Sequence, residues 1–278
     1  MKHINKHTFG PWALVTGASS GIGKEFARQL AASGLNLVLV ARRLPLLEEI
    51  GRTLDDAYGV DYRAMALDLS QEDFLERLET VTRDLDIGLV VSNAGSATPG
   101  EFLSHDPSHL HETVRLSVLA HLDLAHHFGK KLAARQRGGM ILLSGMGASQ
   151  GVPYMANDSA TRAYVLTLGE TLNVELKKDH VHVTVLLPGP TATALSEKMG
   201  FDARSTPLTV EQTVSEGLAA LCANRPSHLS GALFRVMNRL MPRALFRTMN
   251  GNMLRKVVTQ KQQIHPVVLT SGSQQKRS

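Results

Sequence analysis

Short apolar segments alternate with longer segments of helical period along most of the chain, and this alternation constrains the fold more than any other feature. The short segments are rich in Val, Leu and Ile and are bounded by Gly, Asn, Asp or Pro, as buried parallel strands are. Strands are predicted at 12–16, 35–40, 62–67, 87–91, 140–143 and 181–187, with no evident seventh strand. Helices are predicted at 22–33, 45–58, 71–83, 108–135, 156–178 and 209–223. This order predicts an α/β fold in which a doubly wound parallel sheet forms the middle of three α/β/α layers.

The chain has 278 residues, 43% of them apolar, which is enough to bury one sizeable core. A single domain is therefore expected over residues 1–225. The only cysteine, Cys222, excludes an internal disulfide and fits a reducing compartment. No apolar run reaches the roughly 18 residues that span a bilayer, and residues 1–12 show no apolar leader. These features favour a cytoplasmic protein.

The end of the chain is basic, and from Arg225 onward it contains no Asp or Glu although the net charge of the whole chain is only +5. Residues 226–267 are interpreted as an amphipathic extension, in which apolar and Arg residues repeat at near-helical spacing and Pro242 splits the helix. Such a segment fits a membrane surface through 233–256, the rim of a substrate pocket or a partner subunit; the last two are favoured. Residues 268–278 have the composition of a disordered tail.

A glycine-rich loop joins the first predicted strand to the first predicted helix, with the spacing Gly-x-x-x-Gly-x-Gly. Glycines permit the tight turn and let the backbone approach a pyrophosphate, while the helix N-terminus supplies N–H groups and positive potential. The loop therefore predicts a Rossmann-like dinucleotide site. The residues expected to contact the cofactor here are Gly17, Ser19, Ser20, Gly21, Ile22 and Gly23.

The end of the second predicted strand carries Arg42 and Arg43 and no carboxylate. NAD-preferring sites usually place an acidic residue there for the ribose 2′-hydroxyl, whereas Arg accommodates a 2′-phosphate. NADP(H) is therefore expected in preference to NAD(H). Arg42 is assigned to the phosphate and Arg43 to stacking on adenine.

Three more motifs follow the third, fourth and sixth strands. They are Asp68-Leu69, Asn93-Ala94-Gly95 and Pro188-Gly189, the last followed by Thr191 and Thr193. With the glycine-rich loop, they make residues 10–220 resemble the short-chain dehydrogenase/reductase family. The resemblance implies that the three motifs contact adenine, the cofactor ribose and the nicotinamide end, and that the two threonines reach the phosphates or carboxamide.

The catalytic residues of that family are altered in this chain. The family pattern has a Tyr-x-x-x-Lys pair, a Ser thirteen residues before the Tyr, and an Asn in the preceding long helix. The corresponding positions here hold Asp158, Arg162, Gly145 and Ser117. The candidate catalytic residues are therefore Asp158, Arg162, the neighbouring Ser144 and the nearby Tyr154, with Arg162 also placed to contact the cofactor.

An ionised Asp beside a developing alkoxide would repel it, so ordinary ketone reduction is not expected. An iminium needs a hydride but no proton donor, and Asp158 would stabilise its positive charge. The leading interpretation is an NADP(H)-binding oxidoreductase that reduces an activated C=N or C=C bond. Two alternatives stay open: a non-redox isomerase, lyase or cyclase, and an inactive protein that binds cofactor or a partner. Asp158 and Arg162 are also spaced to form an i,i+4 ion pair.

Partners follow from the resemblance and from composition. A small-molecule substrate is expected, and helices 108–135 and 156–178 match those that form subunit interfaces in the family, which implies a homodimer or homotetramer. Basic residues are not interleaved with aromatics, so no nucleic acid is expected. No metal site is predicted, because the histidines between His105 and His127 are interpreted as a solvated or subunit-facing group.

Overall fold

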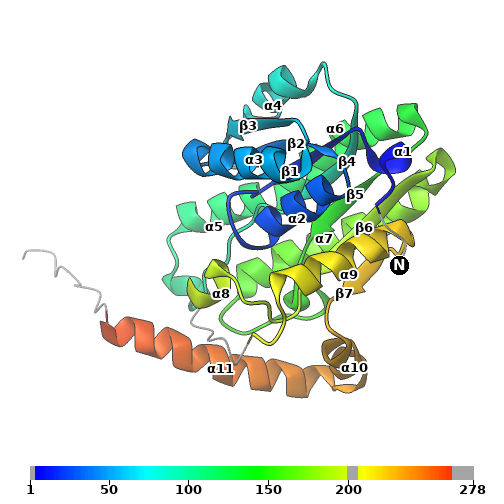
Figure 1. The fold of residues 1–278 in the computed structure, drawn as a ribbon. Helices are drawn as coiled ribbons and strands as arrows, with labels where there is room; N and C mark the ends of the chain where they lie inside the picture. The colour runs from blue at the N-terminus through cyan, green and yellow to red at the C-terminus, as the bar shows by residue number, and fades with distance from the viewer. Residues whose placement is uncertain (1–3, 199–205, 265–278) are drawn as a thin grey trace, which may run out of the picture.

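The computed structural model describes residues 4–198 and 206–264 and contains one parallel sheet in the order β3-β2-β1-β4-β5-β6-β7 (Figure 1). The order reverses direction next to β1, where the chain crosses from one half of the sheet to the other. This is the doubly wound arrangement predicted from the sequence. The strands are β1 (Trp12–Thr16), β2 (Asn36–Ala41), β3 (Tyr62–Ala66), β4 (Ile87–Ser92), β5 (Gly138–Leu143), β6 (Val181–Leu187) and β7 (Ser227–Leu229).

Helices cover both faces of the sheet, because alternate strand residues point to opposite sides. In β1, Ala13 and Val15 pack on one helical layer, whereas Leu14 packs on the other. The first layer holds α2 (Gly21–Ala32), α3 (Leu44–Tyr58) and α9 (Val210–Cys222). The second holds α4 (Phe74–Thr82), α6 (Ala120–Arg135) and α7 (Ala156–Glu175). The predicted three-layer α/β/α architecture is confirmed.

The helix expected at 108–135 is interrupted. It consists of α5 (Pro107–Val114), a single π-helical turn η2 (Arg115–Leu119) and α6. Such turns widen the helix and often occur at functional sites. Ser117 lies on this turn and is buried. The smaller elements are α1 (Lys6–Phe9), η1 (Phe102–Ser104), η3 (Met146–Ser149), η4 (Leu176–Asp179) and α8 (Ala194–Lys198).

A seventh strand, β7, pairs in parallel with β6. This strand was not predicted, because it is three residues long and has His228 at its centre. The side chain of His228 is held by Glu216 of α9, with His228 Nε2 2.8 Å from the carboxylate. Tertiary contacts, and not an apolar pattern, therefore define this strand.

The C-terminal extension forms α10 (Ala232–Leu240) and α11 (Arg243–Ile264), and Pro242 separates them as predicted. In Figure 1 the two helices run along one end of the molecule, away from the sheet. The tail predicted to be disordered at 268–278 lies outside the described residues, as does the end of the extension from 265 to 267. Among the residues described, no helix is long and apolar enough to cross a membrane.

Candidate functional site

A cleft of about 580 Å³ opens at the carboxyl ends of β1, β2 and β4. Its lining brings together most of the residues predicted to bind the cofactor, from six separate segments of the chain. Those lining it are Gly17, Ser19, Ser20, Gly21, Ile22, Arg42, Arg43, Asp68, Leu69, Asn93, Ala94, Gly95, Arg162 and Thr193. Ligands of open parallel sheets bind at this edge, at the point where the strand order reverses.

The glycine-rich loop is shaped by close backbone approaches. Gly17 and Gly21 have φ values of +66° and +53°, in the left-handed region that favours glycine. A Cβ on Gly17 would lie 2.6 Å from Nδ2 of the Asn93 side chain, and a Cβ on Gly23 would overlap the Gly17 carbonyl oxygen. The hydroxyl of Ser20, at the N-terminus of α2, makes no capping hydrogen bond. The loop can therefore receive a phosphate group.

Thr16 and Asn93 fasten this loop to the end of β4. Thr16 Oγ1 accepts hydrogen bonds from the backbone N–H groups of Asn93 and Ala94, at 2.9 and 3.1 Å. The Asn93 side chain donates in return to the Thr16 carbonyl oxygen at 2.9 Å. These bonds hold the motif at 93–95 against the loop before any ligand arrives.

Positive charge gathers at the far end of the cleft, beyond β2. Arg43 Nη2 donates to Ser19 Oγ at 3.2 Å, and both Arg42 and Arg43 are exposed. Burial raises the pKa of Asp68, but hydrogen bonds from Ser70 and the charge of Arg42 lower it overall. Two cations and a hydroxyl thus surround the place where a 2′-phosphate would fit.

Four predicted cofactor residues lie outside the cleft lining: Gly23, Pro188, Gly189 and Thr191. Thr191 is buried, and its hydroxyl donates to the Gly189 carbonyl oxygen and lies 3.1 Å from the hydroxyl of Thr213. The Gly189 N–H is bound by Ser230 Oγ at 2.9 Å. In this structure the polar groups of Gly189 and Thr191 are therefore hydrogen-bonded within the protein, outside the lining of the cleft.

Arg162 and Gly145 interlock. Arg162 Nη1 donates to the Ser144 carbonyl oxygen at 2.8 Å, and Ser144 Oγ donates to the Arg162 carbonyl oxygen at 2.8 Å. A Cβ on Gly145 would overlap the Arg162 guanidinium, whose Cζ would lie 3.1 Å away. Arginine thus occupies the space that a serine side chain would need at 145. The Ser144 hydroxyl is engaged with the backbone of α7.

The ion pair expected between Asp158 and Arg162 is not formed, although both side chains are described. The guanidinium turns to Ser144 instead, because the absent side chain at Gly145 leaves room there. Asp158 is 5% exposed, and its Oδ1 has no hydrogen-bond partner among the residues that the structure describes. Burial raises the pKa of Asp158, while Arg162, the Thr98 backbone and His105 oppose this rise. The chain therefore keeps a buried carboxyl group with one free oxygen.

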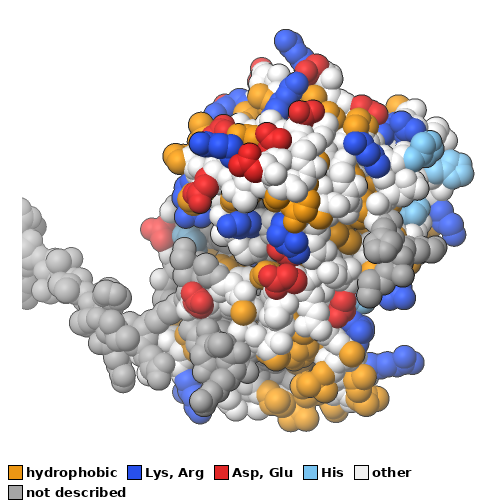
Figure 2. Space-filling model, in the orientation of Figure 1, with side chains coloured by type: hydrophobic (Ala, Val, Ile, Leu, Met, Phe, Trp, Pro, Cys, Tyr) orange, Lys and Arg blue, Asp and Glu red, His pale blue; other side chains and the backbone are white. Residues whose placement is uncertain are grey.

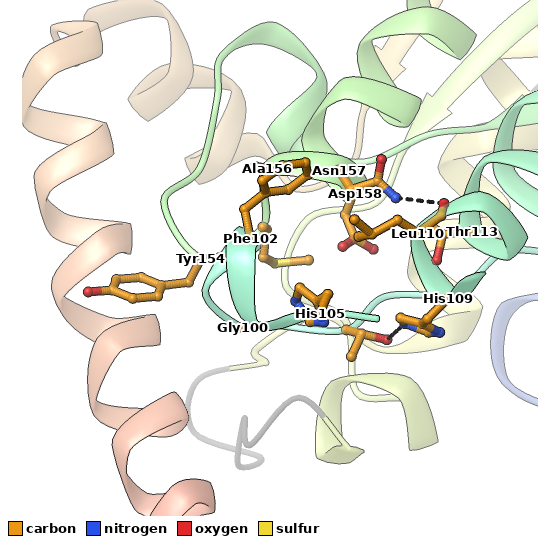
Figure 3. Close-up of a pocket in the computed structure, with 12 residues that line it drawn as sticks. Gly100, Phe102, His105, His109, Leu110, Thr113, Tyr154, Ala156, Asn157 and Asp158 are labelled. Atoms are coloured by element: carbon orange, nitrogen blue, oxygen red, sulfur yellow. Dashed lines mark hydrogen bonds between the residues drawn. The ribbon is translucent and has the colours of Figure 1, made fainter. Parts of the chain in front are cut away.

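Asp158 faces a narrow pocket beside the cleft (Figure 3), lined by η1, α5 and the start of α7. The rings of His105 and His109 line the same pocket with centroids 6.0 Å apart, and His109 Nε2 lies 3.0 Å from Thr98 Oγ1. The ring of Tyr154 points away from Asp158 toward α11. Tyr154 therefore borders the pocket through its backbone, and its phenol is not directed at the carboxyl group.

Two buried polar side chains line the cleft, those of Ser117 and His121. Ser117 Oγ has no hydrogen-bond partner within the described part of the chain. His121, four residues later, lies with its Nδ1 2.8 Å from Ser92 Oγ. Burial is the main cause that lowers the pKa of His121 to about 4, so its ring is neutral. The expectation that this histidine belongs to a solvated or subunit-facing group was wrong: it is 2% exposed and lines the cleft.

Sequence reasoning missed several other cleft residues. Most of them are apolar or common polar residues without a motif, and only their place beside known elements would identify them. They are Val40, Ala41, Leu67, Ser96, Glu112, Leu116, Leu143, Thr161, Val165 and Leu195. His121 gave a weak signal, since it lies one turn beyond Ser117.

The parallel sheet, the glycine-rich loop at the start of α2 and the locked Asn93 define a dinucleotide-binding protein of the Rossmann type. The charge around Arg42 and Arg43 fits the phosphate-bearing form of the cofactor. The family model described as short chain dehydrogenase matches residues 11–203, and the chain belongs to that family.

Known relatives share both sequence and structure with this chain. A 7β-hydroxysteroid dehydrogenase of Clostridium sardiniense is 31% identical over 188 residues, which are 68% of this chain and 72% of the relative. A very-long-chain 3-oxoacyl-CoA reductase of Neurospora crassa is 34% identical over 193 residues, 68% of this chain but only 58% of that longer relative.

Two solved structures extend the comparison. A 7β-hydroxysteroid dehydrogenase structure superposes with a TM-score of 0.82 at 25% identity, covering 88% of this chain and 98% of that one. A Sphingobium yanoikuyae short-chain dehydrogenase in complex with NADPH gives 0.75 at 25% identity, covering 96% and 100%. The chain is thus an oxidoreductase-family protein by sequence and by fold.

Proposed function

We propose that this protein is an NADP(H)-dependent oxidoreductase that reduces an activated C=N or C=C bond, with Asp158 in the place of the usual tyrosine. The observation that carries the proposal is the free Oδ1 of Asp158, buried in a pocket one helical turn from Arg162 in the cofactor cleft. The names of the relatives point to carbonyl and alcohol substrates. This chain has Asp158 in place of the tyrosine that such chemistry uses in the family, so we do not assign the substrates of the relatives to this protein.

An iminium ion suits the pocket best. NADPH, when bound, supplies a hydride. The carboxylate of Asp158 offsets the positive charge of the substrate and positions its C=N bond, and the charge disappears when the hydride arrives. The iminium carbon gains the hydride and the nitrogen becomes a neutral amine, so no proton donor is required.

An enone requires a different protonation state of the same residue. Neutral Asp158 would donate a hydrogen bond to the substrate oxygen and then a proton to the enolate. Burial favours this neutral form, since it raises the pKa of Asp158. The two substrate classes can therefore be separated by pH.

The test is NADPH oxidation, followed by its absorbance, with a panel of cyclic imines, enones and plain ketones. We expect turnover of imines or enones, and a loss of roughly 10²–10³-fold in kcat/KM for D158N, with NADPH binding unchanged. With an imine, kcat/KM should rise with pH through the pKa of Asp158, and with an enone it should fall.

Tyr154→Phe is the matched control, because the Tyr154 ring points away from the carboxyl group, and it should keep full activity. Efficient reduction of plain ketones by both the parent protein and D158N would overturn the proposal. NADPH binding without any oxidation would favour the non-redox or inactive alternatives, and conversion of a substrate that D158N abolishes would then identify an isomerase or lyase.

We further propose a homodimer or homotetramer through the outer faces of α5, α6 and α7. Large apolar side chains are exposed on α7, with Tyr164 and Val174 at 40% and 72%, and on the π turn between α5 and α6, with Leu119 at 44%. We also propose a cytoplasmic location, which the lone cysteine supports. We propose in addition that the chain divides into a body at 1–225 and an extension at 226–267, which the separate helices α10 and α11 support.

A further inference from the structure

The outer face of α10 carries an apolar stripe that nothing in the described chain covers. Leu233, Val236 and Leu240 are 66%, 54% and 75% exposed. Their i, i+3, i+7 spacing places them on one side of the helix. Figure 2 shows hydrophobic side chains gathered at the lower edge of the molecule, where Figure 1 places α10.

Three more large apolar side chains are exposed on α11. Leu245, Met249 and Met253 repeat every four residues and are 50%, 49% and 40% exposed. The buried residues of α11, including Phe246 and Leu254, lie on a different side of the helix and pack inward. The helix is thus attached to the body by one face and presents another apolar face outward. We call the six exposed residues the C-terminal apolar stripe.

Cations accompany this stripe without any carboxylate. No Asp or Glu occurs between Arg225 and the end of the chain. The exposed cations on the two helices are Arg235, Arg239, Arg243, Arg247, Arg255 and Lys256. Among the described residues, Arg235 is the one of these cations that forms an ion pair, with its Nη1 2.6 Å from Glu216 of α9. The surface is therefore both apolar and strongly positive.

The orientation of α10 is fixed by the body of the protein. Glu216 accepts hydrogen bonds from the Gly231 N–H and from Arg235, and it lies 2.8 Å from His228 of β7. These contacts hold the first turn of α10 with Arg235 against Glu216, and they leave the stripe exposed. The apolar face is presented before any partner binds, so little ordering is needed on binding.

We propose that the C-terminal apolar stripe docks on an anionic phospholipid bilayer. Aliphatic and methionine side chains would enter the boundary between headgroups and acyl chains, while the arginines would contact the phosphates. A second copy of the chain fits less well, because two-fold pairing of the stripe would bring like charges together with no carboxylate from either stripe. This inference does not depend on the proposed chemistry of Asp158.

The test is flotation of the full-length protein with vesicles of phosphatidylcholine, with and without phosphatidylglycerol. We expect binding only to the anionic vesicles, and release as salt is raised. The variant L233S/V236S/L240S should lose roughly tenfold or more in affinity. The variant R239Q/R243Q/R247Q should lose roughly fivefold per charge.

Leu103→Ser is the matched control, because Leu103 is 94% exposed but lies on η1 and not on either C-terminal helix; it should bind like the parent protein. Circular dichroism and NADPH binding would show that every variant remains folded. Equal vesicle binding by all variants, or no binding to anionic vesicles, would overturn the proposal. A dimer that light scattering detects in the parent protein and that L233S/V236S/L240S dissociates would assign the stripe to a subunit interface instead.

Discussion

At the scale of single residues, the chemistry that we propose depends on the aspartate at position 158. Tyrosine and aspartate can both donate a proton, but an aspartate loses its proton at a much lower pH than a tyrosine does. A buried aspartate with one free carboxyl oxygen can therefore change its charge in a pH range in which tyrosine stays neutral. The free energy of ionising this buried carboxyl group also contributes to the stability of the fold. In the proposed function, Asp158 would therefore make both the activity and the stability of the protein depend on pH.

We predict that D158N is more stable than the parent protein at neutral pH. The folded pKa of Asp158 lies above its ordinary value of 3.8, so the folded state binds more protons and its stability falls as pH rises through the folded pKa. The amide side chain of D158N does not ionise, so the variant does not lose stability in this way as the pH rises. Urea unfolding at a series of pH values should show a difference that shrinks as the pH approaches 3.8 and below; a less stable D158N at neutral pH would contradict the reading of Asp158 as an unpaired buried acid.

At the scale of elements, the loop after β5 and the helix α7 are adjusted to each other through Gly145 and Arg162. We predict that Gly145→Ser destabilises the protein by about 2 kcal/mol, because the added side chain displaces a charged donor from the Ser144 carbonyl. In the R162K background the same change should cost much less. A double-mutant cycle by chemical unfolding measures this coupling, and simple additivity of the two changes would show that the residues are independent.

The elements also show what the sequence can predict. The glycine-rich loop and Asn93 were predictable because each belongs to a short motif next to a strand. Strand β7 and the π turn at Ser117 were not, since both depend on packing against distant segments. The direction of the Arg162 side chain was predicted wrongly for a similar reason: helical spacing favours Asp158, but the space left at Gly145 favours the Ser144 carbonyl.

At the scale of the whole molecule, the cofactor cleft joins both halves of the sheet, so ligand binding should stabilise the entire fold. We predict that NADPH at about a hundred times its Kd raises the free energy of unfolding by about 2.7 kcal/mol, which is a rise of roughly 5 °C in Tm for a chain of this size. NADH at the same concentration should do much less. Thermal unfolding of the R42A/R43A variant is the check: the two cofactors should then be equivalent, and an unchanged preference would remove the arginines from the 2′-phosphate site.

The contact between Gly145 and Arg162 also sets an order on how this protein can change. A serine at 145 has no room while the guanidinium remains, whereas a lysine at 162 can be introduced first and leaves the space vacant. The family's Ser and Lys are therefore reached at lower cost when position 162 changes before position 145, whereas this contact sets no order for a change at position 158.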